Sequence, residues 1–206
     1  MAARLLGAVL AGGLSRRFGS DKALALIDGC PMIEHVIAAI RPQVDELVIC
    51  GRTWANFESL VDHRIERIGP LAGLETALHY AKTHHFDAVL TVPVDTLPIP
   101  SNLSSLLSGD GPAVLSQQYL IGYWPVGYRD GLTAFLDGGL RSVREWITQR
   151  NARRVDEPMN VININNTTDL LNFSVSRRAA AVGPDAVDWP RRSGALQSGE
   201  APLHCC

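Results

Sequence analysis

Short apolar runs of strand length recur along this chain, and helical patterns lie between the first several of them. The runs are Leu5–Leu10, Leu47–Cys50, Phe86–Val92, Ala113–Leu115 and Val161–Ile164. An alternation of strand and helix predicts a mostly parallel sheet with helices on both faces. Because 206 residues suffice for one sizeable core, we predict a single three-layer α/β/α domain of Rossmann-like architecture.

Helices are predicted where apolar residues recur on one face. A helix should begin at Pro31, since proline suits the first helical turn, and continue to Ile40 along one apolar face. Further helices are predicted over Leu71–Thr83, Leu132–Leu136 and Val143–Arg150. After about Ser174 the pattern fails, because arginine, proline, serine and glycine dominate, so residues 1–173 form the predicted domain and residues 174–206 a poorly ordered tail.

Composition excludes several classes of function. The formal net charge of −2 gives no general attraction to nucleic acid or to an anionic membrane, so a bound anion must be held locally. The apolar run Leu5–Leu10 is too short for a signal peptide or a membrane span. The four cysteines show neither zinc-ligand spacing nor a disulfide framework, which predicts a reducing, cytoplasmic location.

Histidine spacing gives no sign of a metal centre. The six histidines, His35 and the pair His84 and His85 among them, do not follow the spacing of metal ligands. We therefore predict exposed or helix-end positions for them.

The segment LAGGLSRRFGSDK, residues 10–22, follows the first predicted strand directly. Gly12 and Gly13 let the backbone approach phosphate oxygens and offer their N–H groups to them. Arg16, Arg17 and Lys22 add positive charge within side-chain reach of a triphosphate. The segment therefore predicts a phosphate loop, with a glycine turn followed by a solvated basic loop as the alternative.

Two common phosphate loops are excluded by the spacing of this segment. The P-loop of ATPases requires a lysine directly after glycine, and the dinucleotide-binding pattern G-x-G-x-x-G is absent. A P-loop ATPase and an ordinary dinucleotide dehydrogenase are therefore disfavoured.

The loop resembles the signature loop of the molybdenum cofactor guanylyltransferases, a family within the nucleotidyltransferase fold. The resemblance continues, in family order, through GPLAG at 69–73, VPVDT at 92–96, NIN at 163–165 and DL at 169–170. These motifs span roughly residues 5 to 173 of this sequence. The resemblance implies the nucleotidyltransferase fold and a nucleotide site that includes Leu10, Ala11, Gly12, Gly13 and Lys22.

Asp95 follows the apolar run Phe86–Val92, so it should lie at the carboxyl edge of the sheet, where open α/β sheets bind ligands. Mg²⁺ commonly takes only one or two carboxylates, with phosphates and water as its other ligands. The resemblance makes Asp95 the Mg²⁺ ligand and a catalytic residue with Lys22, Arg16 and Arg17. The alternative is an aspartate that caps the following proline-rich turn.

Two further motifs are candidates for the second substrate. The GPLAG segment, which includes Gly73, should open a helix whose first turn favours an anion; close packing of small residues is the equal alternative. Asn163 and Asn165 lie two apart on an extended segment, so their side chains should point the same way. Their alternative role is to cap the helix from Thr167.

The sequence departs from the family at two places near the nucleotide. Where relatives commonly carry Asn and Asp, this chain has Cys50 and either Arg67 or Glu66. The resemblance therefore assigns Cys50 and Arg67 to the nucleotide site, and selection of the base is less well predicted than the chemistry. Relatives also carry His-Pro where this chain has Gln118-Tyr119, so no catalytic role is assigned to those two residues.

The resemblance implies transfer of GMP from GTP to molybdopterin or its metal-bearing form, with pyrophosphate released. GTP and molybdopterin would be the substrates, and recipient molybdoenzymes or their chaperones further partners. The alternatives are a relative that uses CTP or a sugar-phosphate acceptor, and a non-catalytic nucleotide-binding module. Because Asn165 lies far from Lys22 in the sequence, we expect the two to contact different substrates, Asn165 molybdopterin and Lys22 GTP.

Overall fold

The computed structural model of the protein describes residues 3–12, 21–61, 64 and 69–180, with side chains described as far as Arg177. The strands are β1 (Leu5–Leu10), β2 (Leu26–Ile27), β3 (Cys30–Pro31), β4 (Glu46–Cys50), β5 (Glu58–Leu60), β6 (Ala88–Pro93), β7 (Thr96–Leu97), β8 (Ala113–Leu115), β9 (Gly122–Pro125), β10 (Arg153–Val155) and β11 (Ile162–Asn163). The α-helices are α1 (Met32–Ile40), α2 (Pro70–Thr83), α3 (Leu103–Leu107), α4 (Arg129–Asp137), α5 (Val143–Gln149) and α6 (Thr167–Ala180). Short 3-10 helices are η1 (Lys22–Leu24), η2 (Arg41–Gln43) and η3 (Val126–Tyr128).

A seven-stranded sheet in the order β10-β8-β9-β6-β1-β4-β5 forms the centre of the molecule. β1 pairs in parallel with both β4 and β6, β4 with β5, and β10 with β8. β9 is antiparallel to both of its neighbours, β6 and β8. The predicted mostly parallel α/β sheet is therefore confirmed, with β9 as the antiparallel member.

Two apolar layers cover the two faces of this sheet. On one face the core includes the apolar side of α1 and Leu103 and Leu107 of α3. On the other it includes residues of α2, α4 and α5, with Trp124 and Trp146 fully buried between them. The three-layer α/β/α prediction is confirmed, because helices bury apolar side chains against both faces.

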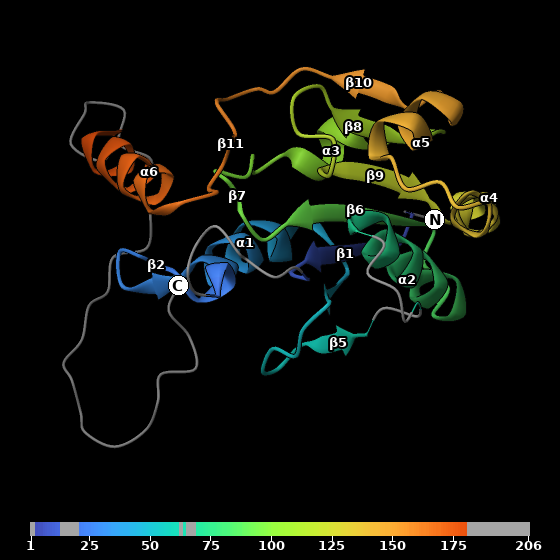
Figure 1. Cartoon of the computed structure of the whole chain (residues 1–206), viewed down its shortest axis with the longest axis horizontal. Helices are drawn as coiled ribbons and strands as arrows, with labels where there is room; N and C mark the ends of the chain where they lie inside the picture. Colours follow the sequence, from blue (N-terminus) through green and yellow to red (C-terminus); the bar gives the residue numbers. More distant parts are fainter. Residues whose placement is uncertain (1–2, 13–20, 62–63, 65–68, 181–206) are drawn as a thin grey trace.

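The carboxyl edge of the sheet is the end toward which β1 and β6 both run. Figure 1 shows β7, β11 and α6 gathered beyond the arrowheads of these two strands. β7 and β11 pair antiparallel in a separate two-stranded sheet, with Thr96 opposite Asn163. The predicted strand Val161–Ile164 is thus shorter than expected and lies outside the main sheet.

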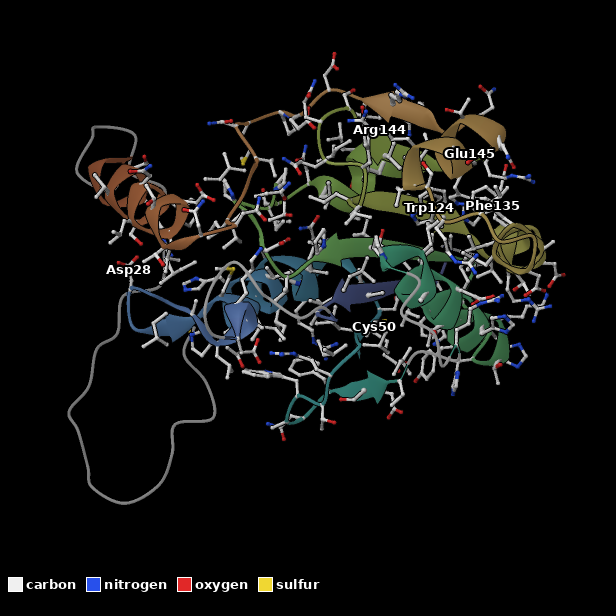
Figure 2. The ribbon with its side chains drawn as sticks, viewed as in Figure 1. Asp28, Cys50, Trp124, Phe135, Arg144 and Glu145 are labelled. Atoms are coloured by element: carbon white, nitrogen blue, oxygen red, sulfur yellow. The ribbon has the colours of Figure 1, made fainter. Side chains whose placement is uncertain are left out.

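The C-terminal helix α6 crosses the domain boundary that the sequence predicts at residue 173. It continues to Ala180, and its Leu170 and Phe173 pack against the core of the α1 face. Arg177 also contacts Asp28 on the turn between β2 and β3, at 3.5 Å. Figure 2 labels Asp28 on that turn. The rest of the predicted tail, 181–206, lies outside the described residues.

Membrane insertion can be judged from the helices that the structure describes. None of these helices is both long enough and apolar enough to span a bilayer.

Candidate active site at the carboxyl edge of the sheet

The glycine loop begins where β1 ends and lies against the ends of its two neighbouring strands. Ala11 N–H donates to the Cys50 carbonyl at 2.9 Å, and Val94 N–H donates to the Leu10 carbonyl at 3.1 Å. These bonds extend the pairing of β1 with β4 and β6 and fix the direction in which the chain enters the loop. Gly12 is exposed just beyond them. Gly13, Arg16 and Arg17 lie outside the described residues, so their predicted phosphate contacts stay predictions.

A second glycine supports this loop from β4. Gly51 has φ of +87°, and a Cβ placed on it would lie 2.5 Å from Gly12 Cα and 2.7 Å from Gly12 N. The two backbone segments can pass this closely only because residue 51 carries no side chain, whereas a Cβ on Gly12 would lie 3.4 Å from Gly51 Cα, an ordinary contact. Gly51 was not among the predicted site residues, although a glycine directly after an apolar strand was the available signal.

Cys50 and Gly73 pack together beneath the loop. The Cys50 side chain is buried, and the residue, labelled in Figure 2, ends β4 between β1 and β5. A Cβ on Gly73 would lie 3.0 Å from Leu10 Cδ2 and 3.6 Å from Cys50 Cβ. The small size of Gly73 thus allows α2 to approach β1 and β4. The close packing that the alternative requires at Gly73 is present, and its contact with the second substrate stays a prediction.

Lys22 is directed toward the site by a local cap. Asp21 accepts a hydrogen bond from Ala23 N–H at 3.1 Å and so caps the 3-10 helix η1. The same carboxylate also pairs with Arg52, which follows β4. Lys22 Nζ then donates to Asp95 Oδ2 at 2.8 Å and to Asn165 Oδ1 at 3.0 Å.

Asp95 lies where the sequence predicts, in the turn after β6 at the carboxyl edge. Its backbone carbonyl accepts from Ile164 N–H at 2.8 Å, which ties this turn to β11. Thr96 Oγ1 donates to Asn163 Oδ1 at 2.7 Å and lies 3.3 Å from Asp95 Oδ1. Asp95 therefore lies between a lysine on one carboxylate oxygen and a threonine hydroxyl on the other. Thr96, which the sequence analysis did not select, links the two site segments.

The helix that follows the asparagines is capped by a different residue. Asn166 Oδ1 accepts from Asp169 N–H at 2.9 Å, and Asp169 Oδ2 accepts from Asn166 N–H at 3.2 Å and from Asn165 N–H at 2.7 Å. This reciprocal arrangement is a capping box. The side chains of Asn163 and Asn165 are instead directed to Thr96 and Lys22, so the capping alternative for them is wrong.

Lys22 and Asn165 are in direct contact, although 143 positions separate them in the sequence. The two residues therefore belong to one cluster, and the expectation that they contact different substrates, Lys22 GTP and Asn165 molybdopterin, stays a prediction. The parallel strands carry Lys22 and Asp95 to one edge, and the β7–β11 pair carries Asn165 to the same place. Asn163 also reaches this cluster, but through Thr96.

A partly buried ion pair joins Arg64 to Glu75 of α2. Arg64 Nε and one terminal nitrogen donate to the two carboxylate oxygens of Glu75 at 2.7 and 2.8 Å, and Arg64 also pairs with Asp137 at 2.8 Å. The Arg64 hydrogen bonds lower the pKa of Glu75. Arg64 is thereby tied to α2 and α4, whereas Arg67, predicted at the nucleotide, lies outside the described residues.

Among the histidines, His35 departs from the prediction of exposed or helix-end positions. His35 is buried in α1, where Nε2 donates to the Ile27 carbonyl at 2.9 Å and Nδ1 faces Arg177 at 3.3 Å. Burial lowers its pKa, since charging the ring without water is unfavourable. His84 and His85 lie exposed beyond the end of α2, as predicted.

The donors around Asp95 suit a hard divalent cation only in part. Nearby oxygens come from one carboxylate and the amides of Asn163 and Asn165. Within the described ranges no cluster of three or more His, Cys, Asp or Glu could hold a metal ion. Mg²⁺ bound through one carboxylate usually completes its shell with phosphates and water. The residues present therefore fit a cation that arrives with a nucleotide.

Comparisons with known proteins agree with this architecture. The family model for the MobA-like NTP transferase domain matches residues 7–155. A molybdenum cofactor guanylyltransferase of Shewanella putrefaciens is 33% identical over 189 residues, which cover 82% of this chain and 95% of that protein. A protein of the same name from Acidiphilium cryptum is 35% identical over 181 residues, covering 81% and 92%.

A solved structure supports the fold. The crystal structure of molybdopterin-guanine dinucleotide biosynthesis protein A from Archaeoglobus fulgidus matches with a TM-score of 0.69 and 20% identity, over 84% of this chain and 99% of that one. At this identity the likeness concerns the fold alone. Taken with the family model and the two sequence relatives, the chain belongs to the molybdenum cofactor guanylyltransferase family of MobA-like NTP transferases and is a nucleotidyltransferase enzyme.

Proposed function

We propose that this chain transfers GMP from GTP to the terminal phosphate of molybdopterin, or of its metal-bearing form. A phosphate oxygen of the acceptor attacks the α-phosphorus of GTP and forms a new P–O bond, while the bond to the β-phosphate oxygen breaks and pyrophosphate leaves. The observation that supports this most strongly is the meeting of Lys22, Asp95 and Asn165 beside the Gly12 loop. The relatives are named molybdenum cofactor guanylyltransferase, which supports a guanylyl donor and a molybdenum cofactor acceptor.

The donor nucleotide would lie over the ends of β1 and β4. Exposed Gly12 offers a backbone without a side chain there, and Lys22 supplies a mobile positive charge for the β- and γ-phosphates. Arg16 and Arg17 would add to that charge. Because developing negative charge on the leaving pyrophosphate is stabilised by fixed cations, this loop acts on the transition state as well as on binding.

Asp95 would hold the divalent cation, for which we propose Mg²⁺, with phosphate oxygens and water as its other ligands. When bound, such a cation neutralises phosphate charge and orients the α-phosphate for in-line attack. The chain itself fixes the Asp95 carboxylate through the Ile164 hydrogen bond to its backbone and through Thr96. Asn163 and Asn165, on the β11 side, would help place the acceptor phosphate.

Labelled GTP tests which bond is broken. Purified protein, molybdopterin and GTP labelled at the α-phosphate should give a labelled dinucleotide, and label at the γ-phosphate should appear only in pyrophosphate. Asp95→Asn should lower the rate by about 100-fold or more while the circular dichroism spectrum stays unchanged. Release of the γ-label as inorganic phosphate would reject the transfer reaction. Binding of GTP without formation of a labelled product would reject it as well.

A further inference from the structure

Lys22 bridges an anionic and a neutral oxygen in the candidate active site. Its ammonium group lies 2.8 Å from Asp95 Oδ2 and 3.0 Å from Asn165 Oδ1. The Lys22 side chain is only 12% exposed and that of Asp95 27% exposed. A pair shielded to this degree interacts more strongly than one in open solvent. Lys22 therefore neutralises much of the charge that Asp95 could offer to another cation.

Within the described part of the chain, the second carboxylate oxygen of Asp95, Oδ1, has no strong donor that would balance the negative charge. Thr96 Oγ1 lies 3.3 Å from Asp95 Oδ1, but it donates its hydrogen to Asn163 at 2.7 Å. Lys22 is thus the principal neighbour that balances the carboxylate. A divalent ion that bound Asp95 would meet the ammonium group beside it, and two cations that share one carboxylate repel each other.

We propose that Lys22 and the divalent cation exchange at Asp95, and that the nucleotide triphosphate drives the exchange by offering Lys22 phosphate oxygens in place of the Asp95 carboxylate. This inference rests on the proposed function. Lysine suits the task because its ammonium is a point charge on a flexible four-carbon stem. The neutral Asn165 side chain keeps its hydrogen bond from the Lys22 ammonium through Oδ1 while the anionic partner changes from Asp95 to the nucleotide phosphates. Metal binding and nucleotide binding are therefore coupled through one side chain, and each tightens the other.

Metal binding in the absence of nucleotide tests the exchange without any turnover. Free Mn²⁺ is measured by electron paramagnetic resonance in titrations of the parent, Lys22→Gln, Lys22→Arg and Lys82→Gln. Lys82 is an exposed residue near the end of α2, so its variant matches the change in net charge alone. Lys22→Gln should bind Mn²⁺ at least about tenfold more tightly, since the variant removes the repulsion between the ammonium and a second cation at the same partly shielded carboxylate. Lys22→Arg and Lys82→Gln should stay within about threefold of the parent, because a cation remains at the site in both.

The carboxylate variant separates this inference from the proposed function. Asp95→Asn added to Lys22→Gln should abolish the gain in Mn²⁺ affinity. If Lys22→Gln binds Mn²⁺ no more tightly than Lys82→Gln, while Asp95→Asn still weakens binding, the exchange is wrong and the metal role of Asp95 stands. If Asp95→Asn leaves the gain intact, the metal lies elsewhere, and both the exchange and the proposed metal role are wrong.

Nucleotide binding without metal gives a second, independent readout. In EDTA, Asp95→Asn should bind GTP several-fold more tightly than the parent, because Lys22 no longer has its carboxylate partner. Asp110→Asn, an exposed aspartate on the loop before β8, controls for net charge. The increase in GTP affinity caused by Asp95→Asn should be smaller when Lys22→Gln is also present, which a double-mutant cycle measures directly. If Asp95→Asn tightens GTP binding equally when Lys22→Gln is also present, the effect comes from repulsion between Asp95 and the phosphates rather than from release of Lys22. That result would overturn the exchange.

Discussion

A Cβ atom on Gly51 would lie 2.5 Å from the Cα of Gly12, so the chain after β4 and the loop after β1 pass each other at a distance that only glycine permits. Gly51→Ala should therefore displace the Gly12 backbone. We expect loss of unfolding free energy of about 2 kcal/mol or more, from the left-handed φ and the clash together, and at least severalfold weaker GTP binding.

Gly29→Ala is the matched control for this change. Gly29 has φ of +85°, yet its added Cβ would meet nothing within 4 Å. Gly29→Ala should therefore lower the free energy of unfolding by about 1–2 kcal/mol, the strain of an alanine at a left-handed φ, and leave GTP affinity unchanged. Thermal unfolding and GTP titration of both variants make the comparison, and equal GTP affinities would show that Gly12 is not part of the nucleotide site.

Asn165 should affect nucleotide binding through Lys22. Because Asn165 Oδ1 holds the Lys22 ammonium, Asn165→Ala should weaken GTP binding by about 0.5–1.5 kcal/mol, less than Lys22→Ala at about 1.5–3 kcal/mol. Asn163→Ala, which loses a bond to Thr96 instead, should leave GTP affinity nearly unchanged. Calorimetric titration with GTP and Mg²⁺ measures all three, and an Asn165→Ala variant equal to the parent would remove Asn165 from the nucleotide side.

The contact between Lys22 and Asn165 is a part of the site that the sequence did not predict. The apolar runs of β1, β4, β6 and β8, the glycine loop and the edge position of Asp95 follow from local pattern, because a buried strand needs a continuous apolar run and ligands collect at carboxyl ends. The meeting of Lys22 with Asp95 and Asn165 spans 73 and 143 positions in sequence. The contact with Asp95 depends on the pairing of β1 with β6, and the contact with Asn165 on the pairing of β7 with β11; no local pattern specifies either pairing.

The elements missed by the sequence analysis have physical reasons of their own. β5 and β10 are three-residue edge strands, and β10 carries two arginines, so neither has the apolar run that predicts a strand. His35 looks like a surface residue by type, but the Ile27 carbonyl and Arg177 satisfy its ring inside the fold. Since Arg177 lies beyond residue 173, we propose that the domain extends to Ala180.

The ion pair between Arg64 and Glu75 should contribute strongly to stability. Glu75→Gln leaves the Arg64 guanidinium without its carboxylate in a site where the Glu75 side chain is 4% exposed, so a loss of about 3 kcal/mol of unfolding free energy is expected. Asp137, whose side chain is 62% exposed, provides the control; Asp137→Asn should cost at most about 1 kcal/mol. Urea denaturation compares the two, and similar losses would show that burial does not set the strength of this pair.

His35 should make the protein sensitive to mild acid. Burial lowers its pKa in the folded state below 6.5, so the unfolded chain binds a proton first as the pH falls. The contribution of the neutral His35 ring to the free energy of unfolding is therefore fully present above pH 6.5. It is lost as the pH falls below that value, at up to about 1.4 kcal/mol per pH unit. His35→Gln should show a shallower loss than the parent between pH 6.5 and 5, whereas exposed His84→Gln should follow the parent. Identical slopes for the parent and His35→Gln would contradict a buried neutral ring.

The most direct test of the account is a comparison of pyrophosphate release with molybdopterin and each of GTP, CTP, ATP and UTP under Mg²⁺. We predict that kcat/KM for GTP exceeds that for each other nucleotide by at least about tenfold, and that release requires the acceptor. A preference for CTP, or release that persists when a sugar phosphate replaces molybdopterin, would contradict guanylyl transfer to molybdopterin.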